Sequence, residues 1–293
     1  MTPQYNDALV STAWLAAHLT DPDLRILDCT WHHVSTHLDG RTQYRGRHLP
    51  GSVHFDIDHI ADKTNPLPHM LPKPTEFADK VGLLGIGSGD RIVVYDRMCG
   101  GAAAARVWWM FRSFGHDNVA MLDGGYGKWT KEELPTEMTA VRPDPRKFTA
   151  TFTPSLVRTL TQMKTTVTGG AEQLIDARGP AKFDGTQADV FPYKKLGHMP
   201  NAVNISWGDL IHPETGALLP PDELQSRFRR AGISLQRPIV TTCASGLTSC
   251  VVALALYILG HRDVAVYDGS WAEWGLLDDG PAQATPVISM VAV

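Results

Sequence analysis

A cysteine stands at the end of a β-branched run, directly before a loop of small residues. The run Ile239–Thr242 has the composition of a buried strand, Cys243 follows it, and an apolar helix pattern begins near Thr248. Backbone N–H groups in such a strand–loop–helix turn form a cradle for anions. The helix N-terminus also favours a thiolate there. The pattern therefore predicts a nucleophilic cysteine, although a cysteine outside such a context is more often a buried core residue.

The loop after the cysteine supplies the groups expected to surround a reacting sulfur. Ser245, two positions after the nucleophile, has a hydroxyl that can relay a proton. The residues expected to line a bound substrate are Ala244, Gly246, Leu247, Thr248 and Ser249. The loop contains no cation, so the charge of an anionic substrate must be neutralised by a side chain from another segment.

The chain repeats itself at low identity, at an offset of about 145 to 150 residues. The paired segments are 27–29 with 175–177, 47–53 with 197–203, 91–96 with 238–243, 114–119 with 259–264, and 122–129 with 267–274. In this alignment Asp96 takes the place of Cys243, so one copy carries the thiol and the other does not. The repeat predicts a domain without the thiol over residues 1–135, a linker at 136–154 and a domain with the thiol over 155–293.

Short β-rich runs alternate with helix patterns in both copies, which favours an α/β fold. Four strands are expected in each copy, at 25–28, 52–55, 92–95 and 119–122, and at 174–176, 202–205, 239–242 and 264–267. Such alternation predicts a parallel sheet covered by helices on both faces. Ligands bind at the carboxyl ends of the strands in such sheets, where Cys243 is placed.

Composition excludes several functional classes. The net charge of −4 gives no broad basic face for nucleic acid. The longest apolar run, 250–259, is too short to span a membrane, and the first residues lack the pattern of a signal peptide. Four cysteines without paired Cys-x-x-Cys spacing indicate neither a disulfide framework nor a zinc site. We expect a cytoplasmic protein with free thiols and no metal or other cofactor.

Over essentially its whole length the chain resembles the tandem-domain sulfurtransferases of the rhodanese superfamily. The segments that carry the resemblance are 48–51, 106–109, 123–125, 176–178, 197–200 and 268–271, read together. The resemblance implies two rhodanese-like domains, of which the second is catalytic, and a persulfide on Cys243. The loop Cys243–Thr248 has a serine and no cations, so it is similar to the 3-mercaptopyruvate branch rather than to the thiosulfate branch, whose loop cations hold a sulfonate.

The resemblance also implies roles outside the cysteine loop. The segment 62–72 is similar to the part of the first domain that faces the active site, so Asp62 and His69 would orient Ser245 and tune its proton transfer. Relatives bind the substrate carboxylate with two arginines, where this chain has Lys182 and Phe191. Lysine supplies charge without the two-pronged grip of a guanidinium. Lys182 is the expected anchor, and Lys194 and Lys195 are the alternatives.

Three other functions are weighed against this interpretation. A thiosulfate sulfurtransferase shares the chemistry but needs a different donor site. A non-catalytic sulfur carrier or regulatory module would use the fold only for binding. A cysteine-dependent phosphatase or arsenate reductase needs an arginine six residues after the nucleophile, where this chain has Ser249. The sulfur acceptor is expected to be cyanide, a small thiol or a protein thiol such as thioredoxin.

The remaining cysteines and tryptophans are expected to be structural. Cys29 and Cys250 are predicted core residues, and Cys99 is predicted to be the exposed thiol. Trp108 and Trp109 are expected to pack in the core or at the domain interface.

Overall fold

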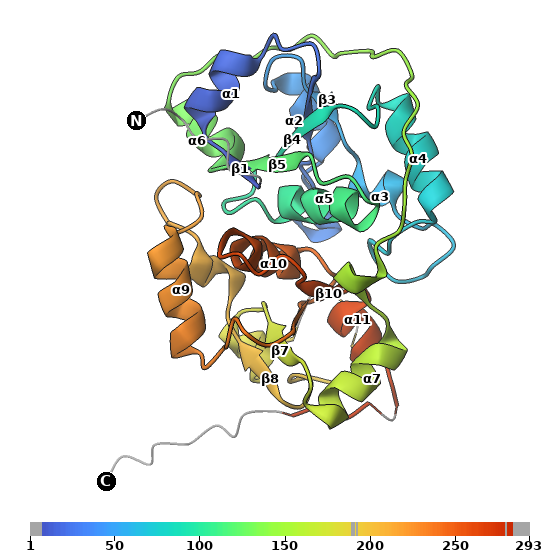
Figure 1. The fold of residues 1–293 in the computed structure, drawn as a ribbon, viewed down its shortest axis with the longest axis vertical. Helices are drawn as coiled ribbons and strands as arrows, with labels where there is room; N and C mark the ends of the chain where they lie inside the picture. Colours follow the sequence, from blue (N-terminus) through green and yellow to red (C-terminus); the bar gives the residue numbers. More distant parts are fainter. Residues whose placement is uncertain (1–7, 189–190, 192, 279, 284–293) are drawn as a thin grey trace.

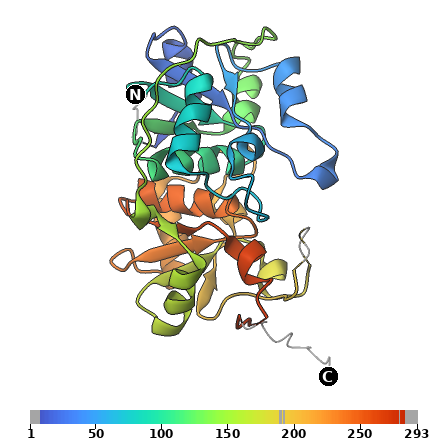
Figure 2. The ribbon, with the colours of Figure 1, turned by 90° about the vertical axis from the view of Figure 1, so that its right-hand side faces the viewer.

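The computed structural model describes residues 8–188, 191, 193–278 and 280–283. They form two lobes stacked along the long axis of the molecule (Figures 1 and 2). Each lobe is built on a five-stranded sheet, and every strand pair in both sheets is parallel. The predicted α/β class with two tandem domains is therefore confirmed.

The first sheet has the strand order β1-β5-β4-β2-β3. Its strands are β1 (Leu9–Val10), β2 (Leu24–Asp28), β3 (Val53–His54), β4 (Arg91–Tyr95) and β5 (Val119–Leu122). Its helices are α1 (Thr12–His18), α2 (Gly40–Gly46), α3 (Ile57–Ile60), α4 (Pro74–Leu83), α5 (Ala102–Ser113) and α6 (Gly125–Lys131). The four expected strands are present, and the two-residue edge strand β1 is an addition.

The second sheet repeats this order as β6-β10-β9-β7-β8. Its strands are β6 (Val157–Arg158), β7 (Gln173–Asp176), β8 (Ala202–Asn204), β9 (Ile239–Thr242) and β10 (Ala265–Tyr267). Its helices are α7 (Leu160–Gly169), α8 (Pro180–Phe183), α9 (Pro221–Arg230), α10 (Thr248–Ile258) and α11 (Ser270–Trp274). Matching orders give the two domains the same topology.

Helices α5 and α10 pack against each other between the two lobes (Figure 1). Each of these helices begins after the loop that follows the central strand of its own sheet, β4 or β9. Both loops therefore lie next to the interface between the domains. The largest apolar cluster runs through this contact and includes the buried side chains of Trp108 and Trp109. Because apolar burial stabilises a contact roughly in proportion to the area removed from water, this interface holds the two domains together as one core.

The segment between the sheets crosses from the first domain to the second mostly as extended chain. Phe148 is buried against Phe77 and Phe111, whereas Phe152 is 42% exposed. Phe152 nevertheless contacts the ring of Phe114, with the ring centroids 6.4 Å apart, so both phenylalanines attach the linker to the first domain. Within the described residues, no helix is long and apolar enough to cross a membrane.

Candidate active site

Cys243 lies directly after β9, at the carboxyl end of the second sheet. Its Sγ accepts a hydrogen bond from the backbone N–H of Gly246 at 3.1 Å. Its own N–H donates to Ser270 Oγ at 3.3 Å, and its carbonyl accepts from Trp271 N–H at 2.9 Å. These bonds fix the thiol at the start of α10, where the helix dipole favours negative charge. The cysteine is 1% exposed, so its sulfur is almost completely shielded from solvent.

Gly246 is the residue that allows the loop to turn back onto the sulfur. Its φ of +81° lies in the left-handed region, which costs a residue with a side chain about 1–2 kcal/mol. A Cβ at this position would lie 2.9 Å from Arg106 Nη1 and 3.0 Å from the Asp268 carbonyl oxygen. Only glycine meets both the backbone and the space requirement, which explains its place three residues after the nucleophile.

A pocket of about 310 Å³ opens beside the cysteine loop. It is lined by Arg178, Gly179, Pro180, Ala181, Lys182, Gln187, Trp207, Ala244 and Thr248. Two of these residues are cations. The Arg178 guanidinium forms a buried two-pronged pair with Asp176, donates to the Gly197 carbonyl and stacks on Trp271. The guanidinium of Arg178 is thus bound by groups of the protein, and Lys182 is the second cation that lines the pocket.

The remaining predicted loop residues divide between the pocket and the core. Ala244 and Thr248 are half-buried and line the pocket. Ser245 is buried in the same loop, one residue before the glycine. Leu247 and Ser249 are buried at the start of α10 and are not among the lining residues. Ala244 and Thr248 are therefore the loop side chains that a ligand in this pocket would touch.

Two other candidate cations are engaged elsewhere. Lys194 Nζ lies 2.8 Å from a carboxylate oxygen of Asp278. Lys195 Nζ donates to the carbonyl oxygens of Asp278 and Gly280. Both lysines tie their loop to the segment after α11 and do not line the pocket. Phe191 contacts the ring of His33 from the first domain, with the ring centroids 5.4 Å apart.

His69 is buried at the domain boundary, and its carboxylate neighbour is Asp58. The His69 Nδ1 lies 3.0 Å from Asp58 Oδ1, and Trp31 Nε1 donates to Asp58 Oδ2 at 2.7 Å. Burial opposes ionisation of Asp58, but the neighbouring His69 and the hydrogen bond from Trp31 leave its pKa lowered. Both ring nitrogens of His69 are buried, and neither forms a well-aligned hydrogen bond within the described residues, although Nδ1 lies within ion-pair distance of Asp58.

Asp62, expected from the resemblance to help orient Ser245, lies beside the His69 segment through its backbone, since its N–H donates to the Met70 carbonyl at 2.9 Å, but its side chain is bonded within its own turn. The Asp62 carboxylate accepts bonds from the N–H and the hydroxyl of Thr64, at 2.8 and 2.7 Å. These bonds lower the pKa of Asp62 and cap a surface turn. Asp-x-Thr is a common turn sequence, and this pattern could have indicated from the sequence that Asp62 bonds within a turn, unlike Asp58.

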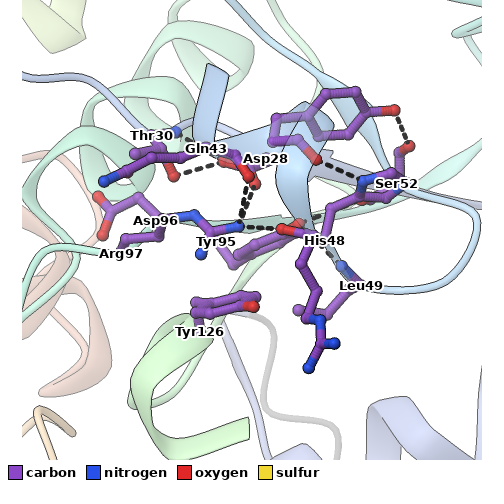
Figure 3. Close-up of polar contacts among 12 residues, drawn as sticks. Asp28, Thr30, Gln43, His48, Leu49, Ser52, Tyr95, Asp96, Arg97 and Tyr126 are labelled. Carbon is purple, nitrogen blue, oxygen red and sulfur yellow. Dashed lines mark hydrogen bonds and ion pairs between the residues drawn. The ribbon is translucent and has the colours of Figure 1, made fainter. Parts of the chain in front are cut away.

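In the first domain, Asp96, Arg97 and Tyr126 lie around the position equivalent to the cysteine loop (Figure 3). Asp96 stands where the second domain has Cys243, and its carboxylate accepts from Met98 N–H at 2.9 Å and from Ala104 N–H at 2.8 Å. Burial raises the pKa of Asp96 to about 7, although the backbone bonds oppose this. Arg97 stacks on Tyr126 at 3.6 Å. The first domain therefore has no nucleophile at this position.

The other cysteines lie as predicted. All four cysteines are free, Cys29 and Cys250 are buried, and Cys99 is exposed. Burial raises the pKa of Cys250 to about 12, so this thiol stays protonated. No group of three or more His, Cys, Asp or Glu in the described part of the chain could hold a metal ion.

Comparison with known proteins gives a consistent family. The model of the rhodanese-like domain matches residues 11–132 and 159–276. The chain is 39% identical to 3-mercaptopyruvate sulfurtransferase of Homo sapiens over 278 residues, 93% of each protein. It is 41% identical to thiosulfate sulfurtransferase of Rattus norvegicus over 273 residues, 91% of each.

A solved structure resembles the fold closely. It is SseA from Escherichia coli, described as a 3-mercaptopyruvate sulfurtransferase with the rhodanese fold, with a TM-score of 0.82 and 36% identity. The match covers 90% of this chain and 98% of SseA. The rhodanese-like segment 159–276 includes the loop that carries Cys243.

Proposed function

The chain belongs to the rhodanese family, and from this premise we propose that Cys243 carries sulfur from 3-mercaptopyruvate to a thiol or cyanide acceptor. The protein is a sulfurtransferase of two tandem rhodanese-like domains. The observation that carries the proposal is the Gly246 N–H aimed at Cys243 Sγ, at the N-terminus of α10. An amide and a helix end can stabilise both a thiolate and a persulfide anion at this atom.

The proposed first step is attack of the Cys243 thiolate on the substrate sulfur. A new S–S bond forms, the C–S bond of 3-mercaptopyruvate breaks, and its electron pair leaves on pyruvate as the enolate. The enolate takes up one proton and becomes pyruvate. In the second step an acceptor thiolate or cyanide attacks the outer sulfur and releases Cys243 as the thiolate. No redox cofactor is needed, because sulfur passes between nucleophiles.

We assign the proton transfer to Ser245, His69 and Asp58. The close contact between Asp58 and His69 Nδ1 fixes the imidazole, as a carboxylate does in other acid–base pairs. The buried Nε2 is then the atom available to exchange a proton with the Ser245 hydroxyl. Asp58 replaces Asp62 in this role, since Asp62 is bonded to Thr64.

Lys182 is the proposed anchor for the carboxylate of the donor. It lies on α8 and lines the pocket together with Ala244 and Thr248 of the cysteine loop. The side chains of Ala244 and Ser245 leave the loop without cations, which favours 3-mercaptopyruvate over the doubly charged thiosulfate. We further propose a reducing compartment, the cytoplasm, and a thiol acceptor such as thioredoxin, because all four cysteines are free.

A cyanolysis assay with both donors tests the function. Thiocyanate formation from 3-mercaptopyruvate should exceed that from thiosulfate, and Cys243→Ser should abolish both while the protein stays folded. Cys99→Ser is the matched control, because this exposed thiol lies outside the cysteine loop, in the first domain, and should not carry sulfur. Faster turnover of thiosulfate by the wild type would instead assign the thiosulfate branch, and equal activity in Cys243→Ser would exclude this mechanism.

A further inference from the structure

The non-catalytic domain reaches the cysteine loop through one buried charge. Arg106 lies on α5 of the first domain, and its side chain is completely buried. Nη1 donates to the carbonyl of Gly246 at 3.2 Å, and Nη2 donates to Asp268 Oδ1 at 2.7 Å and to the carbonyl of His69. One guanidinium therefore contacts the catalytic loop, the loop after β10 and the segment that carries the histidine.

The contact with Gly246 bears directly on the nucleophile. Arg106 holds Gly246 by its carbonyl, while the N–H of the same residue points at Cys243 Sγ. The protonated Cys250 thiol donates to the same carbonyl at 3.2 Å, so two donors fix it. A glycine at positive φ has a wide choice of conformations, and these bonds select the one that directs its N–H to the sulfur.

Asp268 completes the arrangement from the other side. Its second carboxylate oxygen accepts from Leu71 N–H at 2.9 Å, which links it to the loop of the first domain that carries His69. A buried carboxylate paired with a buried guanidinium is costly to break, because the group left behind is an uncompensated charge. Arg106 and Asp268 thus fix the relative position of Cys243 and His69, which come from different domains.

Resting on the proposed function, we infer that Arg106 is a positioning residue for the sulfur transfer, supplied in the same chain by the domain without a nucleophile. It sets the conformation of Gly246 and adds positive charge next to Cys243 and Cys250. The first domain is then a part of the active site rather than a structural duplicate. Its contribution acts on the reactivity of the thiol and leaves the binding of the donor unchanged.

The test compares Arg106→Met and Arg106→Lys with Arg112→Met. Arg112 is on the same helix and also faces the second domain, where it lies over the Tyr257 ring, but it does not touch the cysteine loop. Two readouts are used: kcat and KM with 3-mercaptopyruvate, and the rate at which iodoacetamide alkylates Cys243 at neutral pH. Circular dichroism and thermal unfolding identify the variants that remain folded.

We expect Arg106→Met to lower kcat by about 10- to 100-fold, which corresponds to loss of a hydrogen bond from a charged donor, with KM within about twofold of wild type. The alkylation of Cys243 should slow by about tenfold, because the reactive thiolate loses the stabilisation by the nearby positive charge and by the directed Gly246 N–H. Arg106→Lys should keep the positive charge but only some of the hydrogen bonds, so its kcat and its alkylation rate should lie between those of Arg106→Met and the wild type. Arg112→Met should match the wild type in both readouts.

A folded Arg106→Met with wild-type kcat and wild-type alkylation would overturn the inference. Should that variant not fold, Arg106→Met/Asp268→Asn removes both buried charges, and the same losses are expected of it. Should the double variant also fail to fold, wild-type kcat and alkylation in Arg106→Lys would count against the inference. The alkylation rate needs no sulfur donor, so it still tests Arg106 if the wild type proves inactive with 3-mercaptopyruvate, a result that would contradict only the proposed function.

Discussion

Removing the Lys182 side chain should weaken donor binding without slowing the chemical step. A hydrogen bond to a charged group contributes about 1.5–3 kcal/mol, and about half of that remains at a half-exposed pocket wall. Lys182→Ala should therefore raise KM for 3-mercaptopyruvate by about 4- to 12-fold, with kcat nearly unchanged, because binding in the ground and transition states is lost equally. Lys182→Arg should keep or lower KM, since guanidinium grips a carboxylate with two bonds.

The assay is steady-state pyruvate release at varied donor concentration. Lys194→Ala is the matched control, because this lysine pairs with Asp278 and lies outside the pocket lining. Its KM should equal that of the wild type. Unchanged KM in Lys182→Ala, with a raised KM in Lys194→Ala, would refute the reasoning and move the carboxylate site toward the segment after α11.

Three further changes have defined outcomes. Gly246→Ala should lower kcat by at least about tenfold and lower the free energy of unfolding by about 1–2 kcal/mol or more, because the φ of residue 246 is +81° and the added Cβ would meet Arg106. Urea unfolding measures the loss of stability, and wild-type kcat and stability in this variant would contradict the loop geometry. Asp58→Asn should lower kcat by about 10- to 100-fold, whereas Asp62→Asn should keep kcat within about twofold of the wild type. A larger loss of kcat in Asp62→Asn than in Asp58→Asn would assign the proton transfer to Asp62 instead. Asp96 has a folded-state pKa of about 7 against an ordinary value of 3.8, so the folded state binds its proton more tightly. The contribution of Asp96 to stability is thus largest below the ordinary pKa and falls as pH rises from about 4 to about 7. Asp96→Asn should flatten that decline in a pH series of unfolding free energies, and an unchanged slope would contradict the burial argument.

Much of the fold follows from local pattern. The β-branched runs at Ile239–Thr242 and Arg91–Tyr95 have the length and composition of buried parallel strands, so their position could be predicted. The edge strands Leu9–Val10 and Val157–Arg158 could not, because two residues show no periodicity. Their pairing depends on the strand beside them, which is a tertiary effect.

The residues of the site also differ in whether their neighbours in sequence reveal them. Cys243 is marked by its own neighbours in sequence, a strand before it and a helix after it. Asp58 and Arg106 are not marked in this way, since their partners lie in other segments and, for Arg106, in the other domain. One signal was available for Arg106: an arginine inside the apolar stretch 102–111 requires a buried partner. Sequence alone does not say that the partners are Asp268 and Gly246.

The central claim is that sulfur is held on Cys243, and mass spectrometry after treatment with 3-mercaptopyruvate tests it most directly. The tryptic peptide that contains Cys243 also contains Cys250, so fragment ions must locate the added sulfur. We predict one additional sulfur atom on Cys243, lost when cyanide is added and absent from Cys243→Ser. Sulfur found on Cys99 or Cys250, with none on Cys243, would contradict the account.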